Sequence, residues 1–421
     1  MKLDVEAVRG CYPALADGYA YLDGAAGTQV PASVIDAISS AQIHGLGNSG
    51  GAFPASERAD AITAECRSAI AALTGGQPEG VVLGPNMTTL TYRLAGTLSS
   101  GWGPGDEVVV SRLDHDANVR PWVQAAERTG ATVVWADVDR DTGELHTAQY
   151  SDLITDRTKL VAVTAASNII GTRPDVPAIT AIAHAAGALT YVDGVHATPH
   201  VPADVSAIGA DFYVTSAYKW SGPHIGALIA DPALLDALRP DKLLASPDEV
   251  PDRFEYGTLP FASLAGVTAA VEHLASLTEL AAESATDAQG RLTDRAPVRD
   301  PARLRDRVLA SMAAVERYEQ ELFGVLLAGL DSMPHVRTYG RAASRTATAF
   351  FTVAGLTPEQ VAHYLAAQHI NVWHGHNYAW ELTGALGIRA AGSAVRAGLV
   401  HYNNHAEVER LLTAVAELDG R

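Results

Sequence analysis

Cysteine, positive charge and long apolar runs are scarce in this chain, and each shortage excludes a class of protein. The 2 cysteines, Cys11 and Cys66, have no CxxC spacing, so the sequence predicts neither a disulfide framework nor a zinc site. The 30 Lys and Arg residues are outnumbered by 48 Asp and Glu, and the formal net charge of −18 disfavours a nucleic-acid or anionic-membrane partner. No run reaches the ~18 continuous apolar residues that a membrane helix needs.

The same shortages indicate a cytoplasmic protein that acts on a small molecule. The first residues, MKLDVEAVRGCYPAL, lack a basic segment followed by an apolar run, so we expect no export signal. We also expect no bound metal. At 421 residues and 48% hydrophobic, the chain can bury a large core and exceeds the usual size of one domain.

Short β-rich runs alternate with alanine-rich helical stretches over residues 80–230, which is the rhythm of a βαβ sheet. The runs are nearly unbroken in Val, Ile and Ala, as expected for parallel strands that are buried on both faces. They cover residues 81–83, 106–111, 132–138, 159–167, 188–194, 211–216 and 226–231. The sequence therefore predicts an α/β fold with a mostly parallel sheet, whose ligands gather at the carboxyl ends of the strands.

A smaller α+β unit follows the sheet region in the sequence. Residues 262–281 and 302–330 are expected to form amphipathic helices, and the polar segment 283–300 between them a surface loop or lid. From near residue 335, strand-like runs again alternate with a helical pattern. The predicted organisation is an N-terminal segment 1–20 that joins the small domain, a large domain over 21–330 and a small C-terminal domain over 331–421.

Two residues at predicted strand ends carry the strongest chemical signal. Asp193 closes one apolar strand and Lys219 lies just beyond another, so both should project from the same edge of the sheet. A carboxylate keeps a pyridine nitrogen protonated, which makes the ring an electron sink, and a lysine amine forms an imine that substrate amines displace. Either residue alone is more often a cap or a solvated charge. Together they indicate a pyridine cofactor.

Hydroxyl-bearing residues accompany this pair. GPNMTTLTYRLAG, at 84–96, places Asn86, Thr88 and Thr89 just before a helical pattern, where backbone amides bind phosphate, although the same pattern also fits a simple helix cap. Ser216 and Tyr218 could add hydroxyls. At the end of another strand, His115 is a candidate for stacking on the ring, or else an ordinary packed histidine.

Nearly the whole chain resembles the class V aminotransferase superfamily of fold-type I, and within it the cysteine desulfurase and selenocysteine lyase-like proteins. The resemblance rests on several motifs in order: YLDGAAGTQVP at 21–31, NMTT at 86–89, DHDANVRPW at 114–122, SNIIG at 167–171, DGVHA at 193–197, SAYK at 216–219, RFEYGT at 253–258 and VRAGLVHYNN at 395–404. It implies a fold-type I enzyme that depends on pyridoxal 5'-phosphate (PLP) and acts on an amino acid.

The resemblance also implies roles for individual residues. Lys219 would carry the cofactor as a Schiff base, Asp193 would hold the ring nitrogen and His115 would stack on the ring as the third catalytic residue. The remaining cofactor contacts would be Asn86, Met87, Thr88, Asn168, His196, Ser216, Tyr218 and Thr258, and the substrate contacts Ala25, Ala26, His376, Asn377, Tyr378 and Arg396. His196 stands where the desulfurases usually have glutamine. Thr258 resembles a residue that reaches the neighbouring subunit's phosphate, so a homodimer with shared active sites is implied.

One loop departs from the desulfurase pattern. Those enzymes attack sulfur with a cysteine in an R-x-G-x-x-C loop, whereas INVWHGHNYAWEL has Trp373 in place of the arginine and Tyr378 in place of the cysteine. Persulfide formation by this route is therefore not expected. The leading hypothesis is C–S β-elimination from cysteine, cystine or a cysteine S-conjugate. The alternatives are an epimerase, an aminotransferase or a decarboxylative deaminase of another amino acid and, more remotely, a non-catalytic PLP-binding regulator.

Overall fold

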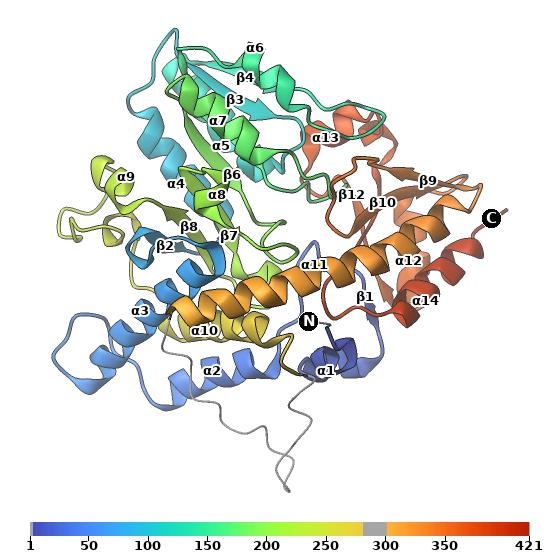
Figure 1. Ribbon diagram of the computed structural model, residues 1–421, viewed down its shortest axis with the longest axis horizontal. Helices are drawn as coiled ribbons and strands as arrows, with labels where there is room; N and C mark the ends of the chain where they lie inside the picture. Colours follow the sequence, from blue (N-terminus) through green and yellow to red (C-terminus); the bar gives the residue numbers. More distant parts are fainter. Residues whose placement is uncertain (1–2, 281–300, 421) are drawn as a thin grey trace, which may run out of the picture.

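The computed structural model describes residues 3–280 and 301–420 (Figure 1). The segment 283–300, which the sequence predicts as a loop or lid, lies outside the described residues. Within those residues, none of the helices combines the length and the apolar character required to span a bilayer.

A seven-stranded sheet forms the centre of the larger part of the molecule. Its strands are β2 (Val81–Gly84), β3 (Glu107–Ser111), β4 (Thr132–Ala136), β5 (Thr158–Thr164), β6 (Leu189–Asp193), β7 (Phe212–Ser216) and β8 (Gly226–Ala230). Their order is β2-β8-β7-β6-β5-β3-β4, and the pairs from β7 to β4 are all parallel. In contrast, β8 runs antiparallel to both neighbours, because the short connection from β7 contains no crossover helix.

Alternate residues of each strand pack into two different cores, which explains why the strand sequences are apolar throughout. In β5, Val161 and Val163 face one core while Leu160 and Ala162 face the other. The first core is closed by α3 (Pro54–Thr74), α7 (Val176–Ala185) and α10 (Phe261–Ser276), and the second by α4 (Met87–Ser99) and α5 (Arg120–Thr129). A sheet covered on both faces keeps its ligand site at the strand ends.

A four-stranded antiparallel sheet organises the C-terminal part. Its strands, in the order β12-β13-β10-β9, are β9 (Val336–Tyr339), β10 (Thr348–Val353), β12 (Trp373–Gly375) and β13 (Ala394–Gly398). The helices α12 (Pro358–Ala367) and α14 (His405–Ala416) pack beside it. Near the N-terminus, β1 (Ala20–Tyr21) pairs in parallel with β11 (Ile370–Asn371), which ties the first residues to this part.

The long helix α11 (Pro301–Asp331) crosses the molecule from α3 and α10 to β9, β10 and α14 (Figure 1). The other helices are α1 (Val5–Gly10), α2 (Ala32–Ile43), α6 (Tyr150–Leu153), α8 (Val205–Ile208), α9 (Pro232–Ala237) and α13 (Trp380–Ala385). The division into domains at residues 20 and 330 stays a prediction.

Candidate active site

A cavity of about 770 Å³, here called the main cavity, lies where the carboxyl ends of the central strands meet the loop after β12. Its lining includes Lys219, His115, Asn168, Arg396 and the segment 373–378, which consists of β12 and the first residues after it. A deeper chamber shares Lys219 and His115 with it and adds Asp193 and His196. The structure thus brings together residues that lie up to 370 positions apart in the sequence, from Ala26 to Arg396.

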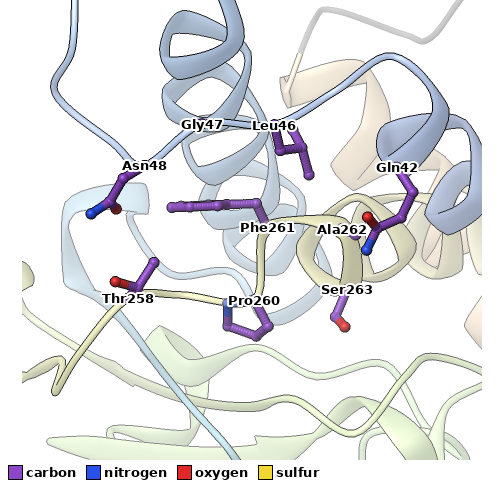
Figure 2. A pocket seen from close by; sticks show the side chains of 9 residues that line it. All are labelled: Gln42, Leu46, Gly47, Asn48, Thr258, Pro260, Phe261, Ala262 and Ser263. Atoms are coloured by element: carbon purple, nitrogen blue, oxygen red, sulfur yellow. The ribbon is translucent and has the colours of Figure 1, made fainter.

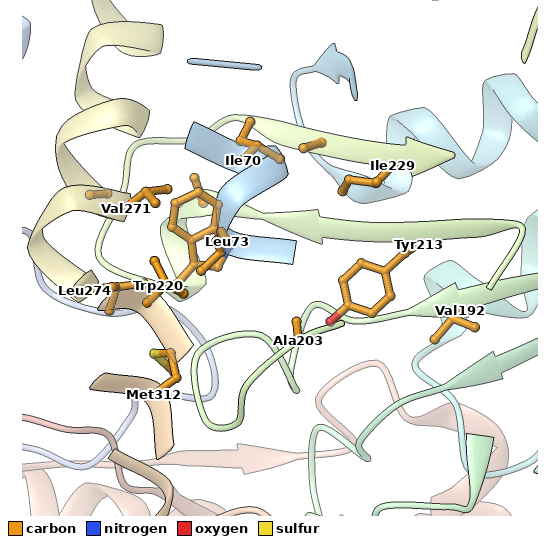
Figure 3. Packing of buried hydrophobic residues seen from close by; sticks show 14 of the residues in the cluster. Ile70, Leu73, Val192, Ala203, Tyr213, Trp220, Ile229, Val271, Leu274 and Met312 are labelled. Atoms are coloured by element: carbon orange, nitrogen blue, oxygen red, sulfur yellow. The ribbon is translucent and has the colours of Figure 1, made fainter. Parts of the chain in front are cut away.

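Lys219 ends a short 3-10 turn, Ala217–Lys219, directly after β7. The next residue, Trp220, is 1% exposed and packs among Ile70, Leu73 and Leu274 in the first core (Figure 3). Burial of so large an apolar side chain stabilises the turn by roughly 2–3 kcal/mol. This packing fixes the backbone from which the Lys219 side chain enters the cavity.

The Lys219 amine is held by the YLDGAAG segment. Its Nζ donates to the carbonyl oxygens of Ala25, at 2.6 Å, and Ala26, at 2.9 Å. Burial, aided by the positive charge of Arg396, lowers the pKa of Lys219 to about 7, although Asp193 opposes the shift. A large fraction of this amine is therefore neutral near pH 7, which is the form that attacks a carbonyl or accepts a proton.

The low pKa of Lys219 has a testable consequence for the Schiff base with PLP that the resemblance implies at this residue. Only the neutral amine attacks the aldehyde, so the rate of appearance of visible absorbance is expected to rise with pH through about 7 and to level off above it. Stopped-flow mixing between pH 5.5 and 9.5 measures this profile. A rate that still climbs steeply above pH 9 would show an ordinary lysine and contradict the expectation.

Asp193 is the last residue of β6, and β6 pairs in parallel with β7, the strand that precedes Lys219. Its side chain is 4% exposed and accepts a hydrogen bond from the backbone N–H of Val195. Burial raises the pKa of Asp193 to about 6, against the effects of that hydrogen bond and of Lys219. The following residue must be glycine, because a Cβ on Gly194 would lie 1.9 Å from the Tyr213 ring.

His115 precedes the 3-10 turn Asp116–Asn118, and its Nδ1 accepts a hydrogen bond from the N–H of Ala117 at 3.0 Å. Burial, together with the charges of Lys219 and Arg396, lowers the pKa of His115 to about 3. The ring is therefore neutral at working pH, with its hydrogen on Nε2. An uncharged flat ring beside the lysine is suited to stacking on an aromatic cofactor.

The start of α4 forms another wall of the site. Asn86 caps the helix by accepting from the Thr89 N–H, while Met87 and Thr88 line the deeper chamber. The Ser216 hydroxyl accepts a hydrogen bond from the Met87 N–H at 3.0 Å. Of the predicted cofactor contacts, Ser216 and Asn86 line neither the main cavity nor the chamber. Tyr218 lines both cavities. The helix N-terminus and these side chains offer a setting for a phosphate group.

Two further predicted cofactor contacts, Asn168 and His196, also line the chamber. Asn168 donates through Nδ2 to the carbonyl of Asn377 at 2.8 Å, and its Oδ1 is buried without a hydrogen-bond partner among the described residues. His196 is 4% exposed, with its Nε2 3.0 Å from the Thr348 hydroxyl. Polar atoms that remain unpaired at a cavity wall are expected where a ligand supplies the missing partner.

Arg396 projects from β13 toward the same cavity and is 4% exposed. Its Nη1 donates to the carbonyl of Asn168 at 3.0 Å, while its Nε has no partner among the described residues. Burial lowers the pKa of Arg396 to about 10, and nearby Asp23 opposes this shift. The guanidinium stays charged at neutral pH and can bind a carboxylate.

The loop after β12 is held over the cavity by main-chain hydrogen bonds. The N–H of Asp116 donates to the carbonyl of Tyr378 at 2.7 Å, and Asn168 holds the carbonyl of Asn377. Asn377 and Tyr378 both adopt left-handed backbone conformations, with φ of 46° and 59°. The Tyr378 ring lies 5.4 Å from that of His115. Backbone strain maintained by hydrogen bonds is common at functional sites.

The loop residue His376 and the tryptophans on either side of the loop, in β12 and α13, divide between the cavity and its surroundings. His376 lines the main cavity and accepts from the N–H of Tyr378 at 3.0 Å. Trp373 also lines it and is 51% exposed, whereas Trp380 is 44% exposed and lies under the Arg389 guanidinium. Because both residues are this exposed, neither is buried in an interface within this chain.

Thr258 and the cysteines lie away from the main cavity. Thr258 lines a separate open pocket of about 520 Å³ with Asn48 and Phe261 (Figure 2). Cys66 is buried within α3, and Cys11, near the N-terminus, has its Sγ 3.6 Å from the carbonyl of Ala7. Neither cysteine lines the main cavity or the chamber.

Sequence reasoning missed several residues that line the main cavity. Tyr92 follows Thr88 by one helical turn, so the helical period of α4 could have placed both on one face. Arg120 also lines the cavity, and its Nη2 lies 2.7 Å from both Asp116 and Glu381. The pairing with Asp116 has the i,i+4 spacing of a helical ion pair, whereas the contact with Glu381 spans 261 positions and has no local signal.

Comparisons with known proteins agree in both sequence and structure. The family model described as aminotransferase class V matches residues 20–296 and 308–411. An uncharacterized protein of Mycobacterium tuberculosis is 37% identical over 99% of this chain and 100% of its own length. A probable cysteine desulfurase of Pseudomonas putida is 32% identical over 97% of this chain and 96% of its own length.

The solved structures confirm the expected fold-type I architecture. The apo cysteine desulfurase of Thermococcus onnurineus matches with a TM-score of 0.85 and 26% identity, covering 99% of this chain and 98% of that protein. A more distant structure, with glycine covalently linked to its PLP cofactor, has the same fold at a TM-score of 0.76 and 20% identity, over 97% of this chain and 99% of its own.

Proposed function

The chain belongs to the class V aminotransferase family, and from this premise we propose that it catalyses β-elimination at the C–S bond of cysteine, cystine or a cysteine S-conjugate. It is a PLP-dependent enzyme that resembles the cysteine desulfurases. The observation that carries the proposal is one cavity that unites Lys219 and Arg396 next to Asp193 and is lined by no cysteine.

The described residues fit PLP. Asp193 is a buried carboxylate for which the described structure provides no ion-pair partner. The protonated ring nitrogen of PLP would supply the missing positive partner. His115 would contact the ring face, and the N-terminus of α4 with Thr88 would hold the phosphate. When bound, PLP supplies an electron sink for the negative charge that develops at the substrate α-carbon.

Different side chains of the cavity would then carry out different steps of the reaction. Arg396 would hold the substrate α-carboxylate, and the neutral Lys219 amine would take the α-proton. The C–S bond would break as its electron pair leaves with the sulfur, which takes up a proton to become hydrogen sulfide from cysteine, a thiol from an S-conjugate or a persulfide from cystine. Addition of water to the remaining three-carbon unit releases pyruvate and ammonia.

This route needs no protein thiol. By the resemblance, Tyr378 would occupy the loop position that carries cysteine in the desulfurases, and burial raises the pKa of the Cys66 thiol above its ordinary value. A protonated, fully buried thiol is a poor nucleophile. We therefore propose release of the sulfur-containing product into solution instead of transfer to the enzyme.

The test is a substrate panel of cysteine, cystine, S-alkyl cysteines and amino acids without sulfur. Pyruvate, thiol and sulfide are assayed together while the visible spectrum is followed. Equimolar pyruvate and sulfur product is the expected result. A change in the visible spectrum without pyruvate would replace the proposal with epimerisation or transamination, and no response to any amino acid would favour a regulator.

Arg396→Ala is expected to lower kcat/KM for the preferred substrate about 100-fold, because two charge-assisted hydrogen bonds to the carboxylate are lost. The corresponding α-carboxamide lacks that charge, so its kcat/KM should change much less. Arg389→Ala is the matched control, since Arg389 stacks on Trp380 outside the cavity. Equal losses for the acid and the amide would contradict a carboxylate role for Arg396.

We also propose that the enzyme is a homodimer with shared active sites. The proposal is supported by the position of Thr258, which by the resemblance would reach the phosphate in the neighbouring subunit. In its own chain, Thr258 lies away from the Lys219 cavity, beside an open pocket (Figure 2). Light scattering on a size-exclusion column would give twice the 44.1 kDa chain mass, and a value of one chain mass would refute it. A cytoplasmic location likewise stays a prediction from the composition.

A further inference from the structure

Exposed aromatic side chains gather in the part of the main cavity that the deeper chamber does not share. Tyr92, Trp373 and Tyr378 line the main cavity but not the chamber that holds Asp193. They come from α4, from β12 and from the loop after β12, and they are 42%, 51% and 67% exposed. A single exposed aromatic residue needs no explanation, but several around one cavity indicate a surface that a ligand covers.

Trp373 lies beside the residue that is proposed to hold the substrate carboxylate. It is the first residue of β12 and is paired directly with Arg396 of the antiparallel strand β13. Directly opposed residues of two such strands have their side chains on the same face of the sheet, with Cβ atoms about 5 Å apart. A substrate held at Arg396 would therefore have Trp373 next to it. By the resemblance, the desulfurases have arginine at this position, so an apolar surface replaces a cation here.

The two tyrosines line space that the cofactor would leave free. Tyr92 lies one turn along α4 from Thr88, which lines both the main cavity and the chamber. One such turn advances the helix by about 6 Å, so Tyr92 lies well beyond the helix start where a phosphate would bind. The Tyr378 ring lies 5.4 Å from the ring of His115. The region between these tyrosines and Trp373 is therefore left for the substrate side chain.

This region is larger than cysteine requires. The main cavity has a volume of about 770 Å³, which is in the range of pockets that hold drug-sized ligands. The side chain of cysteine consists of one methylene group and one sulfur atom, so it cannot contact aromatic residues from α4, β12 and the following loop at once. A group attached to the sulfur could contact all of them.

The charged residues of the cavity disfavour a second negative charge on the substrate. Arg120 lines the cavity, but its Nη2 already lies 2.7 Å from both Asp116 and Glu381. Glu381 also lies 3.4 Å from Nη1 of Arg112, and Arg112 pairs with Asp137. Three carboxylates thus accompany two guanidinium groups, and no excess of positive charge remains for an anionic substituent. Cystine, whose far half carries a second carboxylate, is therefore less well suited than a neutral conjugate.

We propose that Tyr92, Trp373 and Tyr378 form an aromatic subsite for the group attached to the substrate sulfur. The preferred substrates are then cysteine S-conjugates whose substituent is flat, apolar and uncharged, such as a benzyl group. Its ring would pack against the aromatic side chains, while Arg396 and Lys219 act on the amino-acid part. The inference rests on the proposed function and narrows its substrates to one of the three kinds named there.

The first test compares S-benzyl-cysteine with S-methyl-cysteine in the pyruvate assay of the holoenzyme. Both conjugates release an alkanethiol, so the ratio of their kcat/KM values reports contacts with the substituent. The wild-type ratio is expected to be about 50 in favour of the benzyl conjugate. A ratio near one would overturn the subsite.

Variants then assign that preference to the aromatic residues. Trp373→Ala and Tyr92→Ala are each expected to lower the ratio about 10-fold, so the test does not depend on one variant folding. Trp373→Phe retains a flat ring and should restore most of the preference. The matched control is Trp380→Ala, since Trp380 is 44% exposed and does not line the main cavity. This control should keep the wild-type ratio.

The charge argument is tested with S-(4-carboxybenzyl)-cysteine, which places a carboxylate at the far end of the same ring. Its kcat/KM is expected to be about 10-fold below that of S-benzyl-cysteine. Glu381→Gln removes one of the two carboxylates that bind Arg120 and should reduce the difference to about 3-fold. A carboxybenzyl conjugate that reacts as well as the benzyl conjugate would overturn the preference for an uncharged group.

A binding measurement separates the subsite from turnover. The α-methyl derivative of S-benzyl-cysteine has no α-proton, so it can bind without elimination, and the change in the visible spectrum of the holoenzyme gives its Kd. It is expected to bind more tightly than the α-methyl derivative of S-methyl-cysteine, by a factor similar to the kcat/KM ratio. Trp373→Ala should remove most of this difference.

The outcomes distinguish failure of the subsite from failure of the proposed function. Pyruvate from both conjugates at a ratio that Trp373→Ala and Tyr92→Ala leave unchanged would overturn the subsite and leave β-elimination in place. An absence of pyruvate from every conjugate, with a benzyl preference in Kd that Trp373→Ala removes, would refute the proposed function and support the subsite. An equal fall of the ratio in Trp380→Ala would overturn the subsite, because the effect would then not depend on contact with the cavity.

Discussion

Lys219→Ala is expected to abolish the visible absorbance of the lysine-bound cofactor and to lower kcat by about 10⁴-fold. The expected effect is large because, in the proposed mechanism, this one side chain both carries the cofactor and takes the α-proton. Its Nζ lies against the carbonyls of Ala25 and Ala26, and burial lowers the pKa of Lys219 to about 7. In the described structure, Lys219 is the lysine that lines the main cavity, so no neighbouring amine can substitute.

The measurement is the spectrum of the purified variant after incubation with PLP, followed by the pyruvate assay. Lys159→Ala is the matched control, since Lys159 is 43% exposed and pairs with Asp106 at the surface. Added methylamine should restore part of the activity by supplying the missing base. A variant that keeps both the band and the turnover would refute the assignment of Lys219.

Asp193→Asn is expected to lower kcat by about 10³-fold with a much smaller change in KM. The amide is nearly the same size and can keep the hydrogen bond from Val195 N–H, so the strand end should stay in place. It cannot balance a positive charge on the ring nitrogen, and the cofactor then withdraws electrons poorly.

The separation between kcat and KM is the informative part of this prediction. Asp175→Asn provides the control, because Asp175 caps α7 and accepts from the N–H of Ala178 at an exposed site. Loss of stability alone would lower the amount of active enzyme without changing the cofactor spectrum. An Asp193→Asn enzyme within tenfold of wild-type kcat would mean that Asp193 does not act on the ring.

Local patterns account for much of the predicted fold and for part of the site. Buried parallel strands are apolar on both faces, and β5 and β6 are therefore recognisable as continuous apolar runs. Because the polar residue that ends such a strand must lie at the sheet edge, the sequence alone predicts Asp193, Lys219 and His115 as neighbours. Their chemical roles stay predictions that the variants above test.

Other features had no local signal. The antiparallel direction of β8 depends on the connection that follows β7. The apolar composition of GALIA fits a parallel or an antiparallel strand equally well. The position of the loop after β12 depends on Asp116 and Asn168, which lie more than 200 positions away from the residues they hold. Arg120 likewise meets Glu381 across 261 positions.

The sequence by itself determined the α/β class, the sheet edge that bears the site and the residue types that suit a pyridine cofactor, because periodicity and strand ends are encoded by neighbouring residues. Only the tertiary structure decided which side chains of the C-terminal part reach that edge and that His200 and Glu319, 119 positions apart, meet in the interior. Contacts of that kind depend on how distant elements pack, and packing is a property of the whole chain.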